Sequence, residues 1–88
     1  MGKAERDKGA RREREVAQIM GAEKISRMYQ EGPDLFWNGE WIEVKARANG
    51  FRTLYKWLEG EATIIAHKAD RQPWLVTLTL EDFLRLTE

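Results

Sequence analysis

Three residues, Asp34, Glu43 and Lys45, combine two carboxylates with a nearby lysine, a set of side chains that could hold a cation and do chemistry together. Between the two acids lies Asn38-Gly39, a dipeptide that tolerates the positive φ angles of a two-residue type I′ turn. The flanking residues are therefore expected to pair as an antiparallel hairpin. In the register set by that turn, Asp34 lies directly opposite Glu43.

Two directly opposed carboxylates need a cation between them. Side chains at such positions are about 4.5–5.5 Å apart at Cβ, where like charges repel each other. Mg²⁺ binds through one or two carboxylates and keeps several waters, one of which it can activate as a nucleophile. Strand alternation also predicts which residues share the face of this pair: Asp34, Phe36, Trp41, Glu43, Lys45 and Arg47, with Leu35, Ile42, Val44 and Ala46 on the other face.

A further carboxylate is expected to point at the same place. Residues from about Asp7 to Gly21 favour a helix, with Gly21 as its stop. Glu13 lies in the middle of the apolar stripe of that helix, which is formed by Gly9, Ala10, Val16, Ala17 and Met20. Because a lone carboxylate in an apolar stripe is costly, Glu13 is expected to face the Asp34 and Glu43 pair.

The rest of the chain supplies the elements that must position these side chains. Strands are expected over 24–29, 34–37, 40–47, 62–67 and 74–78. A helix is expected over 51–60, with Phe51, Leu54, Tyr55 and Leu58 on its core-facing side, and a short last helix opens with a capping pattern from Thr79 to Asp82. The element order is therefore α-β-β-β-α-β-β-α.

Composition limits the architecture. The chain has 88 residues, 42% of them apolar and 34% charged, and its net charge is zero. We expect one domain, 1–88, with residues 1–6 as a candidate flexible arm. No Cys is present, so no disulfide supports the small core, and a homodimer is expected to complete it. No apolar leader or run of about 20 apolar residues occurs, so we expect a cytoplasmic protein with no membrane partner.

The residues around Asp34 and Glu43 resemble the motif of a known enzyme family. Pro33-Asp34 followed by Glu43-Val44-Lys45 resembles the signature of the PD-(D/E)XK nucleases. The element order is similar to their α-β-β-β-α-β core, which implies an α/β, restriction-endonuclease-like fold with a mixed central sheet and flanking helices. The opening "KGARRERE" and Arg27 resemble archaeal-type Holliday junction resolvases, and the short chain is similar to the small virus-type replication-repair nucleases of phages and bacteria.

The resemblance implies a site and a substrate. Glu13, Asp34 and Glu43 would hold Mg²⁺ or Mn²⁺, and Lys45 would position or polarise the attacking water and the scissile phosphate. The implied activity is endonucleolytic cleavage of branched or otherwise structured DNA, in recombination, replication or packaging in a bacterial or phage-infected cell. The expected DNA contacts are basic: Arg6, Lys8, Arg11, Arg14, Arg27 and Arg47.

Several of these assignments have structural alternatives. Glu13 could instead form a salt bridge to Lys45 or Arg27 without metal. The basic residues of the first helix could form a solvated face, and Arg27 could be an exposed strand residue. His67 is expected to end a strand in solvent. Trp57 could contact a second subunit, the interpretation favoured here, or could belong to a base-stacking or phosphate-binding surface.

At the level of function, the alternative to an enzyme is a catalytically silent module with a nuclease fold, which would hold DNA or a partner protein. The occurrence of Glu13, Asp34, Glu43 and Lys45 together favours the enzyme, because a silent scaffold has no evident need for opposed carboxylates.

Overall fold

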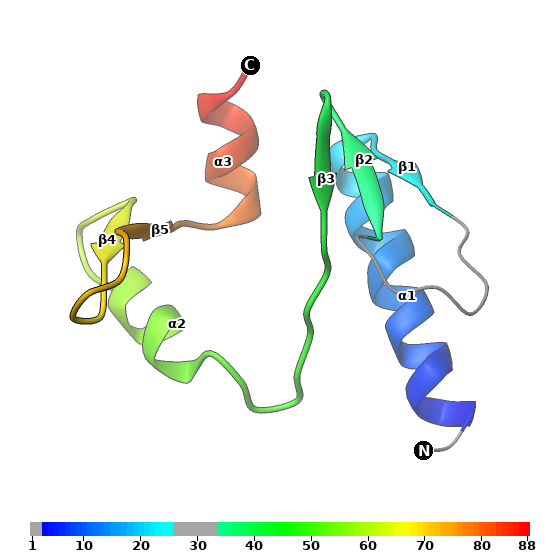
Figure 1. The fold of residues 1–88 in the computed structure, drawn as a ribbon, viewed down its shortest axis with the longest axis horizontal. Coiled ribbons are helices and arrows are strands. Elements are labelled where there is room, and N and C mark those ends of the chain that lie inside the picture. The colour runs from blue at the N-terminus through cyan, green and yellow to red at the C-terminus, as the bar shows by residue number, and fades with distance from the viewer. Residues whose placement is uncertain (1–2, 26–33) are drawn as a thin grey trace. The chain divides into compact units, whose positions relative to one another are not determined.

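The computed structural model describes the backbone of residues 3–25 and 34–88, and the side chains of that range from residue 9 onward. Its elements follow the order α1, β1, β2, β3, α2, β4, β5, α3, as predicted (Figure 1). The chain forms two compact units, Met1–Ala46 and Arg47–Glu88, and each is described here by itself. No helix in the described ranges is long and apolar enough to cross a membrane.

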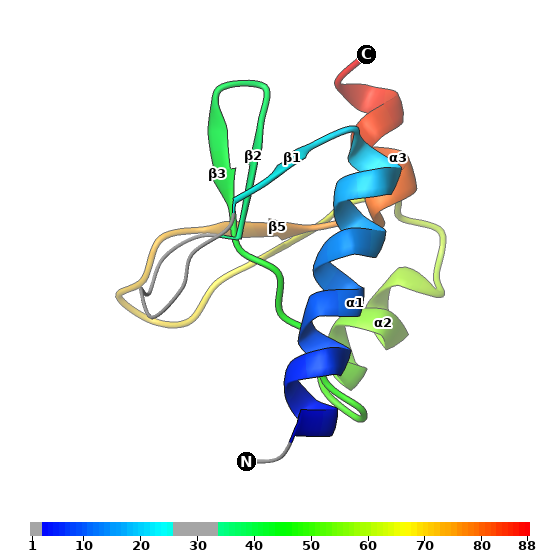
Figure 2. The ribbon, with the colours of Figure 1, turned by 90° about the vertical axis from the view of Figure 1, so that its right-hand side faces the viewer.

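The first unit begins with helix α1, Lys3–Met20, which starts four residues before the predicted boundary. The helix ends where the sequence predicts, because Gly21 adopts the left-handed conformation, with φ 69°, that a glycine after the last turn readily adopts. The backbone N–H of Ala22 donates to Ala17 O at 2.9 Å and closes that turn. Helix α1 packs against the three-stranded sheet that follows it (Figures 1 and 2).

That sheet is antiparallel, with strand order β1-β2-β3. Strands β1, β2 and β3 span Glu23–Lys24, Leu35–Trp37 and Glu40–Ile42. Asn38 and Gly39 have φ angles of 50° and 82°, as the predicted type I′ turn requires. The expected register is confirmed for three pairs: Leu35 with Ile42, Phe36 with Trp41, and Trp37 with Glu40.

The hairpin ladder stops one pair earlier than predicted. Strand β3 ends at Ile42 and not at Arg47, so Asp34 and Glu43 do not form a ladder pair. Within the ladder, the rings of Phe36 and Trp41 meet edge to face with centroids 4.8 Å apart, which confirms that these two side chains share a face. Leu35, on the opposite face, is completely buried.

The second unit contains α2, Arg52–Leu58, then an antiparallel hairpin of β4, Ile65–His67, and β5, Leu75–Thr77, and finally α3, Leu80–Leu86. The predicted cap of the last helix is confirmed, because the N–H of Asp82 donates to Thr79 Oγ1 at 3.1 Å.

Two predictions about this unit are corrected. The face of α2 expected to form a core is not buried: Leu54 and Leu58 are half-buried, whereas Phe51 and Tyr55 are exposed. The physical reason is that these four side chains line a groove that no other described side chain of the unit fills. His67 was expected to end its strand in solvent, but it is half-buried, and its Nε2 lies 2.8 Å from Thr77 Oγ1.

The strands belong to a mixed α/β structure whose described residues contain two small antiparallel sheets, one in each unit. The expected single mixed sheet of a nuclease-like core stays a prediction. Both hairpins pair neighbouring segments through short connections, which costs less loop-closure entropy than a parallel crossover. The expectation of one domain and of a homodimer stays a prediction.

Candidate metal and catalytic site

The site is centred on Asp34, whose backbone is held from both sides of the first sheet. Its N–H donates to Ile42 O at 2.8 Å, and its carbonyl oxygen accepts a hydrogen bond from the N–H of Ile25 at 3.0 Å. Leu35 also has Ile42 as its ladder partner, so two consecutive residues oppose one, as in a β-bulge. A bulge interrupts the strict alternation of side chains along a strand and can re-aim one of them.

The carboxylate of Asp34 connects the two halves of the predicted motif. Its Oδ2 accepts a hydrogen bond from the N–H of Val44 at 2.7 Å. This bond attaches the segment after β3, which carries Glu43 and Lys45, to the start of β2. Cross-strand pairing was predicted to join Asp34 to the segment that carries Glu43. A hydrogen bond from the backbone to the Asp34 side chain joins them instead.

Glu13 meets Asp34, as the sequence predicts. Partial burial raises the pKa of Glu13 above its ordinary value, and a hydrogen bond from its protonated carboxyl group to Asp34 and the negative charge of Asp34 raise it further. The side chain of Glu13 is 27% exposed. The unit therefore holds two acidic side chains together from α1 and from the residue before β2.

A lysine that the sequence analysis did not single out moderates this repulsion. Lys24 of β1 places its Nζ 3.8 Å from Glu13 Oε2, and its positive charge lowers the Glu13 pKa in opposition to the other effects. Among the described residues, the cation beside Glu13 is thus Lys24 and not Lys45, while Arg27, the other partner named in the alternative interpretation, lies outside them. The predicted strand 24–29 did include Lys24. In the structure Lys24 lies opposite Leu35 of β2, and nothing in the local sequence indicates that register.

Glu43 and Lys45 pair with each other instead of joining the Glu13 and Asp34 pair. Lys45 Nζ lies 3.5 Å from Glu43 Oε1, with both side chains more than half exposed. Among the described residues, no group of three or more His, Cys, Asp and Glu side chains is close enough to hold a metal ion. The structure therefore brings together two of the three expected ligands, Glu13 and Asp34, and leaves Glu43 in a neighbouring exposed ion pair.

The structure describes some of the predicted DNA-binding side chains and not others. Arg11 and Arg14 are exposed on α1, and Arg12 beside them pairs with Glu15 at 3.0 Å. Arg47 is exposed at the start of the second unit. The side chains of Arg6 and Lys8, and all of Arg27 and Pro33, lie outside what the structure describes.

In comparisons with known proteins, no family model, no curated protein and no solved structure matches the chain.

Proposed function

We propose that this protein is a divalent-metal-dependent endonuclease that hydrolyses phosphodiester bonds in branched or otherwise structured DNA. The observation that carries the proposal is the contact between Glu13 and Asp34, in which partial burial and mutual repulsion raise the Glu13 pKa. Two adjacent acids repel each other when both are ionised, and perturbed carboxyl pairs are typical of catalytic and metal sites.

The donor set fits a hard divalent cation. Glu13 and Asp34 supply carboxylate oxygens, the donors that Mg²⁺ and Mn²⁺ prefer, and two carboxylates with water are a sufficient protein contribution for Mg²⁺. We assign Glu13 and Asp34 as the ligands, with Glu43 as a third that would have to leave its ion pair with Lys45. Such an ion lowers the pKa of a bound water and neutralises charge on the phosphate.

The chain's own residues have distinct roles in this proposal. Asp34 attaches the segment 43–45, which carries Lys45, to the start of β2 through its bond to the Val44 N–H. Lys45, which is 63% exposed, is free to exchange Glu43 for the scissile phosphate and to hold the attacking water. Arg11 and Arg14 supply exposed positive charge for the DNA backbone.

The test is cleavage of labelled duplex, flap and four-way junction DNA with and without Mg²⁺ or Mn²⁺. The variants are Asp34→Asn, Glu13→Gln and Lys45→Ala, with Lys68→Ala as a matched exposed lysine. We expect metal-dependent cutting in the parent and the control, and a loss of at least about a hundredfold in the three site variants. Cutting that persists in Asp34→Asn and Lys45→Ala would contradict the assignment.

A second candidate, a silent DNA-holding module, has one observation in its favour. Two carboxylates each have a lysine beside them, Lys24 with Glu13 and Lys45 with Glu43, and these ion pairs neutralise charge without a metal. The module would bind the same DNA substrates and cut none of them in either metal. The cleavage experiment therefore distinguishes the two functions.

A further inference from the structure

The second unit, Arg47–Glu88, carries two adjoining hollows that share one residue, Tyr55. The first, the apolar groove, has a volume of about 300 Å³ and is lined by Phe51, Leu54, Tyr55, Leu58 and the segment 77–80. The second, the basic cleft, has a volume of about 630 Å³ and is lined by Arg47, Ala48, Asn49, Gly50, Arg52, Thr53, Tyr55, Lys56 and Glu59. Tyr55 thus forms the boundary between an apolar surface and a charged one.

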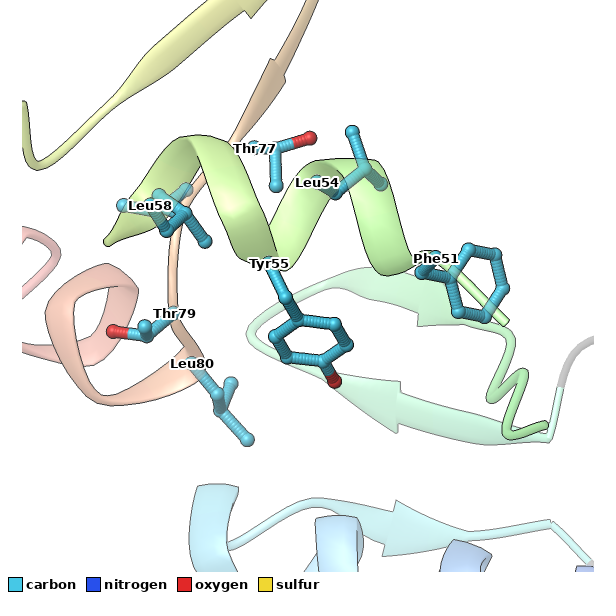
Figure 3. Close-up of a pocket in the computed structure, with 8 residues that line it drawn as sticks. Phe51, Leu54, Tyr55, Leu58, Thr77, Thr79 and Leu80 are labelled. Atoms are coloured by element: carbon cyan, nitrogen blue, oxygen red, sulfur yellow. The ribbon is translucent and has the colours of Figure 1, made fainter. Parts of the chain in front are cut away.

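The apolar groove presents aromatic rings to solvent. Tyr55 is 68% exposed and Phe51 is 44% exposed. In the close-up of Figure 3 the Tyr55 ring extends away from α2, with its hydroxyl group at the far end, while Leu54 and Leu58 lie along the helix. Exposed rings of this kind next to aliphatic side chains are suited to stacking against a flat apolar group.

The basic cleft carries positive charge that the described residues do not neutralise. Arg47, Arg52 and Lys56 line it, and none of the three forms an ion pair with any described residue. Arg52 and Lys56 are four residues apart on α2, so their side chains lie on the same side of the helix. Glu59 is the one acidic residue of the lining, which leaves the cleft with a net positive charge.

The backbone before α2 brings the third cation to the cleft. Phe51 adopts a left-handed conformation, with φ 63°, and turns the chain sharply into the helix. Gly50 packs so closely against the side chain of Arg47 that an added Cβ would lie 2.8 Å from Arg47 Cβ. A side chain at position 50 would therefore displace Arg47, and the absence of one lets Arg47 lie against the turn.

We infer that these two hollows form one binding site for single-stranded nucleic acid, with phosphates in the basic cleft and bases stacked on Tyr55 and Phe51. A single strand is anionic along its backbone and apolar on its base faces, and the two hollows offer that pair of surfaces on either side of Tyr55. A regular duplex hides its base faces and presents only phosphates to such a surface. Charge and apolar surface together therefore favour an unpaired strand.

This binding site deepens the proposed nuclease function, and the choice of DNA as its ligand rests on that function. It adds that the unpaired strand of a branched substrate binds to the second unit. Every lining residue of the two hollows belongs to Arg47–Glu88, whereas Glu13 and Asp34 belong to the first unit. Binding can therefore be measured without metal, under conditions where no hydrolysis occurs.

The experiment is fluorescence anisotropy with labelled oligodeoxythymidine of about 12 nucleotides, and with a duplex of the same length, in EDTA. The variants are Tyr55→Ala and the double variant Arg52→Gln/Lys56→Gln. Lys68→Gln/Arg85→Gln is the control, since it removes the same charge from the same unit outside both hollows. Urea unfolding of each variant establishes that it is folded.

We expect the single strand to bind more tightly than the duplex. Tyr55→Ala is expected to weaken single-strand binding by roughly 5- to 150-fold, the loss of one stacked base, while Tyr55→Phe stays near the parent. Removing both cations is expected to reduce the slope of log K against log salt concentration by up to about 1.4. The control is expected to change neither quantity by a comparable amount.

Equal binding of duplex and single strand, or equal losses in the charge variant and its control, would overturn the inference. So would binding of anionic lipid vesicles that depends on Tyr55 when single-strand binding does not. A third outcome is a folded Tyr55→Ala variant that has lost single-strand binding but still cuts DNA. It would disprove only the link between this binding site and the proposed nuclease activity. Intact single-strand binding with no cleavage in any metal would disprove the nuclease and leave the binding site standing.

Discussion

Asp34 Oδ2 accepts a hydrogen bond from the backbone N–H of Val44 at a distance of 2.7 Å. This bond joins the residue before β2 to the segment after β3 at the point where the hairpin ladder has ended. Hydrogen bonds from backbone N–H groups to an ionised carboxylate are among the stronger ones in proteins. Asp34 therefore has a structural role in addition to the catalytic role proposed for it.

The first prediction separates these two roles of Asp34. Asp34→Ala removes the acceptor of the Val44 N–H in a half-buried position and is expected to lower the free energy of unfolding by about 1–3 kcal/mol. Asp34→Asn keeps an acceptor oxygen and is expected to lose less. Both variants are expected to lose cleavage.

Urea unfolding followed by circular dichroism measures the difference in the free energy of unfolding. Asp70→Ala is an exposed control and is expected to stay within about 0.5 kcal/mol of the parent. Equal destabilisation in Asp34→Asn and Asp34→Ala would contradict the role of the bond.

The second prediction concerns pH. The folded protein binds the Glu13 proton more tightly than the unfolded chain, in which this group titrates near its ordinary pKa of 4.5. The corresponding stabilisation is present in full below pH 4.5 and is lost as the pH rises through the raised folded pKa. Relative to Glu13→Gln, the parent is therefore expected to lose stability as the pH rises above 4.5.

Urea unfolding across that pH range, together with NMR titration of the Glu13 carboxyl carbon, measures this effect. Glu40→Gln, which removes an exposed carboxyl group from the same unit, is the control. Lys24→Gln is expected to raise the Glu13 pKa further, because Lys24 opposes the other effects. A Glu13 pKa at or below 4.5 in the parent would refute the prediction.

The third prediction concerns the metal. An ion that binds only the folded protein stabilises it by about 2.7 kcal/mol at a concentration a hundredfold above Kd. We expect Mn²⁺ and Mg²⁺ to raise the melting temperature of the parent, and EDTA to reverse the rise. Glu13→Gln and Asp34→Asn are expected to abolish it, whereas Lys45→Ala is expected to retain it while cleavage is lost. Thermal unfolding by differential scanning fluorimetry is the measurement, and an equal rise in all four proteins would rule out this site.

The fourth prediction tests the cap of α3. Thr79 Oγ1 accepts the N–H of Asp82 at 3.1 Å, so Thr79→Ala is expected to cost about 1 kcal/mol. Thr79→Ser keeps the acceptor and is expected to cost much less. Thermal unfolding with hydrogen exchange at the amides of residues 80–86 measures the effect, and exchange that is unchanged in Thr79→Ala would argue against the cap.

Local chemistry made part of this fold predictable. Asn38-Gly39 specifies a type I′ turn through its tolerance of positive φ, and that turn alone sets the register of the three pairs between β2 and β3. Gly21 and Thr79 likewise mark a helix end and a helix start through interactions within a few residues. The element order follows from these signals.

Long-range geometry set the limits of prediction. Alternation in an ideal strand put Asp34 opposite Glu43, but the bulge-like pairing of Asp34 and Leu35 with Ile42 ends the ladder and turns Asp34 toward Val44 and Glu13. Whether the helical face of Phe51 and Tyr55 is buried was equally beyond local pattern, because burial depends on what packs against it.

The sequence by itself determined the order of the elements, the hairpin turn and the placing of Glu13 on the apolar side of α1, since each depends on residues close together in the chain. Only the tertiary structure decided that Glu13 meets Asp34, that Lys24 is the cation beside it, and that Glu43 stays with Lys45. The reason is physical: contacts between distant segments depend on strand register and packing, and a shift of one residue changes which side chains meet.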